Sequence, residues 1–249
     1  MFTDLFFKIF ESLPRQGPGS NKYTREAYAA LKNIPQNPRI LDLGCGSGFQ
    51  TIELADISNG QICAVDTHLS FLKKLTGYAK QNDNGKNIHA VNGSMLDIGF
   101  KKESFDIIWA EGSIYFIGLE KGLIEFDYFL KPPGYIAATE VSWLKKDPPD
   151  EVRKYFEEEY PAIKSIEENL NIIKKSGYSV IDHFTLGEDA WWDNYYTPLE
   201  KQIDLYLEEY AGDDNALDML KSLKIEISMY RKYSDWYGYV FYVMQKKEN

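Results

Sequence analysis

The sequence predicts an α/β fold built on a doubly wound, mostly parallel β-sheet. The apolar stretch at residues 39–43 has the composition of a strand buried on both faces, and it runs directly into a glycine-rich turn at residues 44–48. A helix pattern follows at residues 49–55, with apolar side chains gathered near one face. Strand, glycine turn and helix in this order form the nucleotide-binding half of such a sheet.

Length and composition fit one domain spanning residues 1–249. Hydrophobic residues make up 44% of the chain and charged residues 27%, a balance typical of globular proteins. The net charge of −10 argues against a nucleic-acid partner, because an acidic surface repels a phosphate backbone. The two cysteines, Cys45 and Cys63, suit a reducing compartment, and three histidines without a clustered pattern indicate no metal site.

The first 38 residues are expected to form a helical cap segment. Residues 2–13 are apolar, but charged residues interrupt them and the apolar positions share one helical face. We therefore expect a helix here, and a cytoplasmic protein with no membrane partner. Turn-forming residues at 14–21 give a loop that can fold over a ligand, and a second helix starts near Tyr23.

The spacing of the glycines discriminates between nucleotide ligands. A dinucleotide-binding turn reads Gly-x-Gly-x-x-Gly, whereas this turn reads Gly-x-Gly-x-Gly and has Phe49 in the third position. NAD is therefore disfavoured, and a tight turn without a ligand is the structural alternative. Asp66 ends the next expected strand, at 61–66, where a carboxylate can accept hydrogen bonds from both ribose hydroxyls; a strand-end cap is its alternative role.

The glycine turn resembles motif I of the class I S-adenosylmethionine-dependent methyltransferases, and the chain resembles their ubiquinone/menaquinone-methyltransferase-like group. The resemblance implies S-adenosylmethionine as the cofactor. It also implies a seven-stranded sheet of the Rossmann-like methyltransferase fold with an antiparallel edge strand. The cofactor-side residues that it implies are Tyr23, Asp42, Gly44, Cys45, Gly46, Asp66, Thr67, Ser94 and Met95, with ordinary packing as the alternative for Tyr23. Glu111 and Gly112 are expected on the cofactor side because they follow the strand at 104–110, and a capping role is the alternative for Glu111.

Ser94 stands where the family usually has an acidic residue near the adenine, and Met95 can lie against the purine ring.

The remaining elements alternate as this fold requires. A helix over 69–81 should turn Leu69, Leu72 and Leu75 inward before a turn ends it. Further helices are expected at 118–130, from 147 onward and at 165–176. Strands are expected at 87–92, 104–110, 135–141 (after a Lys-Pro-Pro-Gly break at 131–134), 178–186 and 236–245.

Candidate catalytic groups lie beyond the carboxyl ends of the strands, where ligands bind in open α/β sheets. Glu111, Tyr115 and Glu140 are the candidates for a general base, whereas His183 lies within a strand and fits a structural role better. Methyl transfer itself demands no dedicated catalytic residue, because the cofactor carries its own leaving group. A base is needed only if the acceptor must lose a proton.

Residues 187–235 form a helical, aromatic insertion that is too long for a hairpin connection. It contains Trp-Trp-Asp-Asn-Tyr-Tyr at 191–196 and two helix patterns, at 198–210 and 214–233. One interpretation is that its rings roof the site, which puts Tyr115, Trp143, Trp192 and Tyr196 on the substrate side. The other is that the rings are scaffold, buried on the helices of the sheet.

The sequence therefore indicates an S-adenosylmethionine-dependent methyltransferase that acts on a small molecule by in-line methyl transfer. The alternatives are an RNA or protein methyltransferase, an NAD-linked oxidoreductase and a nucleotide-binding module without catalysis. The acceptor atom and the oligomeric state stay open.

Overall fold

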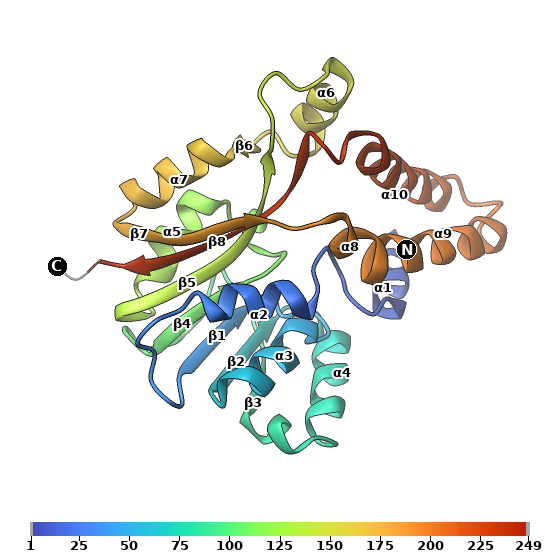
Figure 1. The fold of residues 1–249 in the computed structure, drawn as a ribbon. Helices are drawn as coiled ribbons and strands as arrows, with labels where there is room; N and C mark the ends of the chain where they lie inside the picture. The colour runs from blue at the N-terminus through green and yellow to red at the C-terminus, as the bar shows by residue number, and fades with distance from the viewer. Residues whose placement is uncertain (1, 248–249) are drawn as a thin grey trace.

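The computed structural model describes residues 2–247 and contains one eight-stranded sheet with helices on both faces (Figure 1). The main path of the sheet runs β3-β2-β1-β4-β5-β8-β7, and the two-residue strand β6 pairs with β5. Strand β8 is antiparallel to both β5 and β7, whereas the other neighbours are parallel. The predicted doubly wound, mostly parallel sheet is confirmed, with the antiparallel strand one position in from the edge.

Successive side chains of the central strand β1 point to opposite faces of the sheet, and both faces are buried. Ile40 of β1 packs into the core on one face of the sheet, and Leu41 and Leu43 pack into the core on the other. This double burial explains the continuous apolar run. The strands are β1 (Arg39–Leu43), β2 (Gln61–Asp66), β3 (Ile88–Asn92), β4 (Phe105–Ala110), β5 (Leu130–Trp143), β6 (Lys164–Ser165), β7 (Tyr178–Thr185) and β8 (Tyr237–Lys246).

The helices divide between the two faces of the sheet and its carboxyl edge. Helices α2 and α3 contribute to the core on one face, and α5 and α7 to the core on the other. The helices are α1 (Phe2–Ser12), α2 (Asn21–Ala29), α3 (Phe49–Ser58), α4 (Leu69–Ala79), α5 (Leu119–Asp127), α6 (Asp150–Glu159), α7 (Ile166–Lys175), α8 (Glu188–Trp191), α9 (Thr197–Glu209) and α10 (Asp214–Tyr233). Short 3-10 turns occupy Asp83–Asn87 and Ile114–Phe116, and a π-turn, η3, occupies Trp192–Tyr196.

Two details differ from the sequence-based expectation. Leu69 is 57% exposed, because it is the first residue of α4 and faces outward, while Leu72 and Leu75 are buried as expected. The break expected at 131–134 lies within strand β5, which begins at Leu130. Phe105 pairs with Leu130 and Ile107 with Tyr135, so the prolines sit in an irregularity of the ladder, where no regular hydrogen bond is lost.

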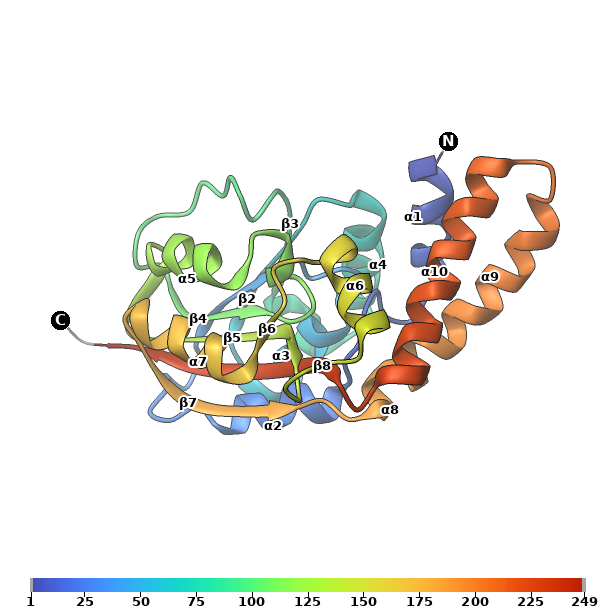
Figure 2. The same ribbon diagram turned by 90° about the horizontal axis from the view of Figure 1, so that it is seen from above.

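A layer of helices stands at the carboxyl edge of the sheet. Helix α1 packs against both α9 and α10, and Figures 1 and 2 show the three helices side by side beyond the strand ends. The two helices expected in the insertion are present as α9 and α10, whereas α8 and η3, which cover the aromatic hexapeptide, were not anticipated as helical. This layer places the N-terminal segment and the insertion over the same end of the sheet.

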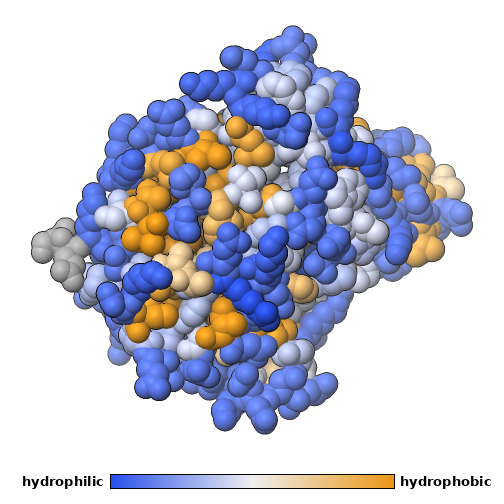
Figure 3. Space-filling view, viewed as in Figure 1, coloured by the Kyte–Doolittle hydropathy of each residue, from blue (hydrophilic) through white to orange (hydrophobic). Residues whose placement is uncertain are grey.

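The surface in the view of Figure 3 is mostly hydrophilic, with hydrophobic patches over the sheet. Over residues 2–247, the model contains no helix with the length and apolar character needed to span a bilayer.

Candidate functional site

The glycine turn lies at the carboxyl end of β1 and is tied to β2. The backbone nitrogens of Gly44 and Cys45 both donate to the carbonyl of Val65, at 2.9 and 3.0 Å. Gly44 has a φ of 71° and Gly46 a φ of 54°, in the left-handed region. A Cβ on Gly44 would lie 2.4 Å from the nearest side-chain carbon, and this leaves no room for any residue but glycine.

Asp66 has a half-buried carboxylate that holds this turn in place. Its Oδ2 accepts a hydrogen bond from the backbone nitrogen of Gly46 at 2.9 Å, and its Oδ1 accepts one from that of His68 at 2.8 Å. The capping role considered for Asp66 is therefore real. Each carboxylate oxygen keeps lone pairs for a ligand hydroxyl, so the two roles are compatible.

Asp42 supports the turn from below and has no exposed surface. The Thr51 hydroxyl donates to Asp42 Oδ2 at 2.6 Å, and Gln50 Nε2 donates to both carboxylate oxygens at 3.3 Å. Burial raises the pKa of the Asp42 carboxyl to about 7. Burial likewise raises the pKa of the Cys45 thiol. Asp42 thus connects the strand end to the start of α3, and both side chains are buried.

The loop after α1 closes over the glycine turn through Gln16. Its Oε1 accepts from both the backbone nitrogen and the hydroxyl of Ser47, each at 2.9 Å, while its Nε2 donates to the carbonyl of Phe10 at 3.2 Å. A loop that folds over the glycine motif was expected from the turn-forming residues. The sequence offered no signal that singled out Gln16, because its partners lie far along the chain.

Arg15 and Glu111 form a buried ion pair beside the turn. Arg15 Nη2 donates to Glu111 Oε1 at 2.8 Å, and the two side chains are 5% and 0% exposed. Thr24 Oγ1 and Trp109 Nε1 donate to Glu111 Oε2 at 2.9 and 3.0 Å. Glu111 is therefore fully engaged, while Nε and Nη1 of Arg15 are buried without a hydrogen-bond partner. A buried guanidinium with two unpaired nitrogens is suited to bind a carboxylate.

Tyr23 connects α2 to the start of the insertion. Its hydroxyl donates to Asp189 Oδ1 at 2.5 Å and accepts from the backbone nitrogen of Gly187 at 2.8 Å. Its ring is 4% exposed and lies outside the walls of the cavity described below. These contacts give Tyr23 a packing role in this structure.

Thr67, Ser94 and Met95 lie on the loops that follow β2 and β3. The Thr67 side chain is exposed, and its carbonyl accepts from Asn92 Nδ2 at 2.9 Å. Ser94 and Met95 are half-buried, and the Met95 methyl lies 3.5 Å from the position of a Cβ on Gly44. Of the three residues, Met95 therefore lies closest to the glycine turn.

A cavity of about 340 Å³ opens between the glycine-turn side of the sheet and the helical layer. Gly112 and Tyr115, which follow β4, contribute to its floor together with Tyr237 and Tyr239 of β8. Helices α1 and α6, residues 16–18 and the insertion supply the other walls. The cavity is thus assembled from segments spread over almost the whole chain.

The insertion contributes rings to this cavity, although not all of those expected. Tyr196 and Tyr115 line it as expected, and Trp191 and Tyr195 line it as well. Trp192 instead packs beneath Arg231, whose guanidinium carbon lies 4.8 Å from the ring centroid. The π-turn at Trp192–Tyr196 sets which side chains face inward, and hydrophobic spacing alone did not reveal it.

Trp143 also lies outside the cavity lining. It packs edge-on against Phe156 of α6, with ring centroids 5.2 Å apart.

Glu140 and Tyr160 form a second polar pair at the end of β5. The Tyr160 hydroxyl donates to Glu140 Oε1 at 2.7 Å, whereas Glu140 Oε2 is buried without a partner. Burial raises the pKa of the Glu140 carboxyl to about 7. Tyr160 lines the cavity and its ring centroid lies 6.3 Å from that of Tyr115, so the hydroxyl connects Glu140 to the cavity wall.

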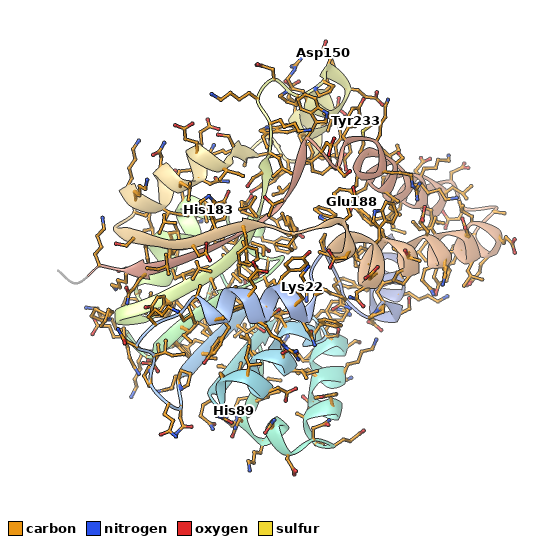
Figure 4. All side chains as sticks on the ribbon, in the orientation of Figure 1. Lys22, His89, Asp150, His183, Glu188 and Tyr233 are labelled. Carbon is orange, nitrogen blue, oxygen red and sulfur yellow. The ribbon has the colours of Figure 1, made fainter. Side chains whose placement is uncertain are left out.

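His183 takes no part in this site. It is exposed on the edge strand β7, within the sheet and apart from the helical layer (Figure 4), and its ring is parallel to that of Tyr242 at 6.5 Å. The structural role favoured for it is consistent with this position.

A model of a methyltransferase domain matches residues 34–209. Among curated proteins, the sterol 24-C-methyltransferase erg-4 of Neurospora crassa is 25% identical over 211 residues, which are 79% of this chain and 55% of that protein. This chain spans about a third to a half of the length of the curated relatives it matches first.

Solved structures share the fold across most of the chain. A methyltransferase from Geobacter sulfurreducens in complex with S-adenosyl-L-homocysteine has a TM-score of 0.82 at 19% identity, with 98% of each chain covered. A phosphoethanolamine N-methyltransferase from Haemonchus contortus, solved with S-adenosyl-L-methionine, has a TM-score of 0.68 at 20% identity and covers 100% of this chain and 58% of its own.

Proposed function

Because the chain belongs to the class I S-adenosylmethionine-dependent methyltransferases, we propose that it methylates a small molecule bound in the aromatic cavity. One observation carries the proposal: the glycine turn with Asp66 and the cavity are joined at the carboxyl edge of the sheet by Gln16, which bonds Ser47 and lines the cavity. Ligands of open α/β sheets bind at this edge.

The residues around the turn fit the cofactor's functional groups. Arg15 would bind the cofactor's carboxylate, because two of its nitrogens, Nε and Nη1, are buried and unsatisfied. Asp66 would accept hydrogen bonds from the ribose hydroxyls, and Met95 would lie against the adenine. When bound, S-adenosylmethionine supplies an activated methyl group and a neutral thioether leaving group.

The protein's part in the reaction is then to align the acceptor and to exclude water. The helical layer covers the site at the carboxyl edge of the sheet, and Gln16 connects the N-terminal loop to the glycine turn by hydrogen bonds. A small acceptor fits the cavity volume of about 340 Å³. The small-molecule substrates named for the Neurospora and Haemonchus relatives support the same class.

We expect Asp66→Ala to weaken S-adenosylhomocysteine binding about 10- to 100-fold, because charge-assisted hydrogen bonds to the ribose are lost. The free energy of unfolding should fall by about 1–2 kcal/mol, since two backbone N–H groups also lose their acceptor. Titration calorimetry measures the first effect and denaturant unfolding the second.

The matched control is Asp56→Ala, which removes an exposed carboxylate from α3 on the same half of the sheet. NAD should bind neither variant nor the wild type measurably. Tight binding of NAD, or normal cofactor affinity of Asp66→Ala, would contradict the assignment of this site.

Glu140 is the base that we propose for acceptors that must lose a proton, acting through the Tyr160 hydroxyl. A base works only in its ionised form, and burial puts the pKa of Glu140 at about 7. We therefore expect kcat/KM to fall about tenfold per pH unit below pH 7.

The Glu140→Gln variant should lose this ionisation from its pH profile and turn over slowly at every pH. Titration of the acceptor itself would remain in both proteins, so the difference between the two profiles isolates Glu140. Identical profiles would show that Glu140 is structural.

Membership of the ubiquinone/menaquinone-methyltransferase-like subgroup remains a prediction. The cytoplasmic location, which the two free cysteines suit, remains a prediction as well. RNA methylation is disfavoured by the net charge of −10, and protein methylation is an outcome that the experiments below would reveal.

A further inference from the structure

We propose that the acceptor is a protonated amine, held in the cavity by Glu226 and the tyrosine rings that surround it. This inference rests on the proposed function, since it names the substrate class of the same cavity.

The charged residues that line the cavity are all acidic. Glu159 and Glu226 are among its lining residues, and no Lys, Arg or His is among those that the structure describes. The nearby guanidinium of Arg15 is engaged by Glu111 outside these walls. A phosphate or carboxylate acceptor would therefore be repelled, whereas an ammonium group would be attracted.

Glu226 of α10 is placed to receive that cation. Its Oε1 accepts hydrogen bonds from the hydroxyls of Tyr196 at 3.0 Å and Tyr195 at 3.3 Å, which fix the carboxylate against the cavity. Within residues 2–247 it forms no salt bridge. Burial raises the pKa of the half-buried Glu226 carboxyl, as expected for an acid without a counter-ion. A bound ammonium group would supply the missing charge.

The walls around Glu226 are suited to a cation as well as to an apolar body. Tyr115, Tyr155, Tyr237 and Tyr239 all line the cavity. Burial and then the charge of Glu226 raise the pKa of the Tyr115 and Tyr155 hydroxyls. Aromatic faces attract ammonium ions that lie within about 6 Å of the ring centroid, and the attraction is strongest when water is excluded.

Trp191 provides an independent sign that a polar ligand belongs here. Its ring is 4% exposed and lines the cavity, and its Nε1 has no hydrogen-bond partner. A buried indole N–H normally has an acceptor. An acceptor atom on the bound molecule would satisfy it.

The side chains near the cavity include a base that can deprotonate an amine acceptor. The ammonium must first give a proton to a base, and Glu140 can take it through Tyr160. The freed nitrogen lone pair then forms the N–C bond as the S–C bond breaks. The sulfur keeps the bonding electrons, and the positive charge passes from sulfonium to nitrogen.

Three probes of similar shape test the proposal: 2-phenylethylamine, 2-phenylethanol and phenylacetate, titrated calorimetrically into the protein saturated with S-adenosylhomocysteine. We expect the amine to bind at least tenfold more tightly than the alcohol and phenylacetate not to bind. Glu226→Gln should weaken amine binding at least tenfold and leave the alcohol unchanged. Glu158→Gln, which removes an exposed carboxylate from α6, is the matched control and should behave as the wild type.

Three results would overturn the proposal: no preference for the amine, no amine binding, or a preference that survives in Glu226→Gln. Should Glu226→Gln fold poorly, Glu226→Asp keeps the charge and must keep the preference. If Glu226→Gln weakens S-adenosylmethionine but not S-adenosylhomocysteine, the carboxylate serves the cofactor's sulfonium instead. Failure of the proposed function is distinct, because neither cofactor form would then bind.

Discussion

Arg15→Met is expected to lower the free energy of unfolding by about 3–5 kcal/mol, because it leaves the buried Glu111 carboxylate without a counter-ion. The same variant should bind S-adenosylhomocysteine at least tenfold more weakly, since the two unpaired nitrogens proposed to hold the cofactor carboxylate are gone. Chemical denaturation and calorimetry measure the two effects separately.

A double variant separates the stability role of Arg15 from its binding role. In Arg15→Met/Glu111→Gln the amide still accepts from Thr24 and Trp109 and carries no charge, so most of the lost stability should return. Cofactor affinity should stay low. Arg153→Met, which removes an exposed arginine from a surface ion pair, is the control and should change little. Recovery of both properties in the double variant would show that Arg15 does not touch the cofactor.

Gly44→Ala is expected to destabilise the protein by about 3 kcal/mol and to abolish measurable cofactor binding. The new Cβ would meet the Cβ of Ser113 at 2.4 Å, and the φ of 71° is strained for any residue with a side chain. Ser113 is buried and its hydroxyl donates to the Leu43 carbonyl, so it has no room to move aside. Thermal unfolding and S-adenosylhomocysteine titration check both effects.

Gly77→Ala provides the matched comparison. Gly77 lies in helix α4 with no heavy atom within 4 Å of an added Cβ, so alanine should stabilise the helix by up to about 1 kcal/mol and leave binding unchanged. A Gly44→Ala protein as stable as the wild type would mean that the glycine turn repacks easily and that its geometry is not what shapes the site.

The sequence was sufficient to predict the elements whose spacing and residue types form a local pattern. The strand, glycine turn and helix around Gly44 and the strand that ends at Asp66 follow from spacing and residue type within about thirty positions. The departures also have local causes: Leu69 shares the apolar spacing of Leu72 but stands at the first, outward-facing position of α4.

The residues that form the walls of the site could not be predicted from the sequence, because the walls depend on tertiary contacts. Arg15 meets Glu111 across 96 positions, and Glu226 reaches Tyr196 across 30. No periodicity connects such residues. The aromatic hexapeptide did indicate a covered site, yet which of its rings face inward depends on a π-turn that hydrophobic spacing does not reveal.

The most direct test of methyl transfer to a small molecule uses S-adenosylmethionine with an isotopically labelled methyl group, incubated with the protein, a panel of low-molecular-mass amines, alcohols and acids, and separate samples of RNA and protein. Mass spectrometry then follows the label and the release of S-adenosylhomocysteine. We predict equimolar S-adenosylhomocysteine and a labelled small molecule, with the Asp66→Ala protein much less active at a cofactor concentration that half-saturates the wild type. Label that appears only in RNA or protein, or cofactor that binds without turnover on any acceptor, would contradict the account.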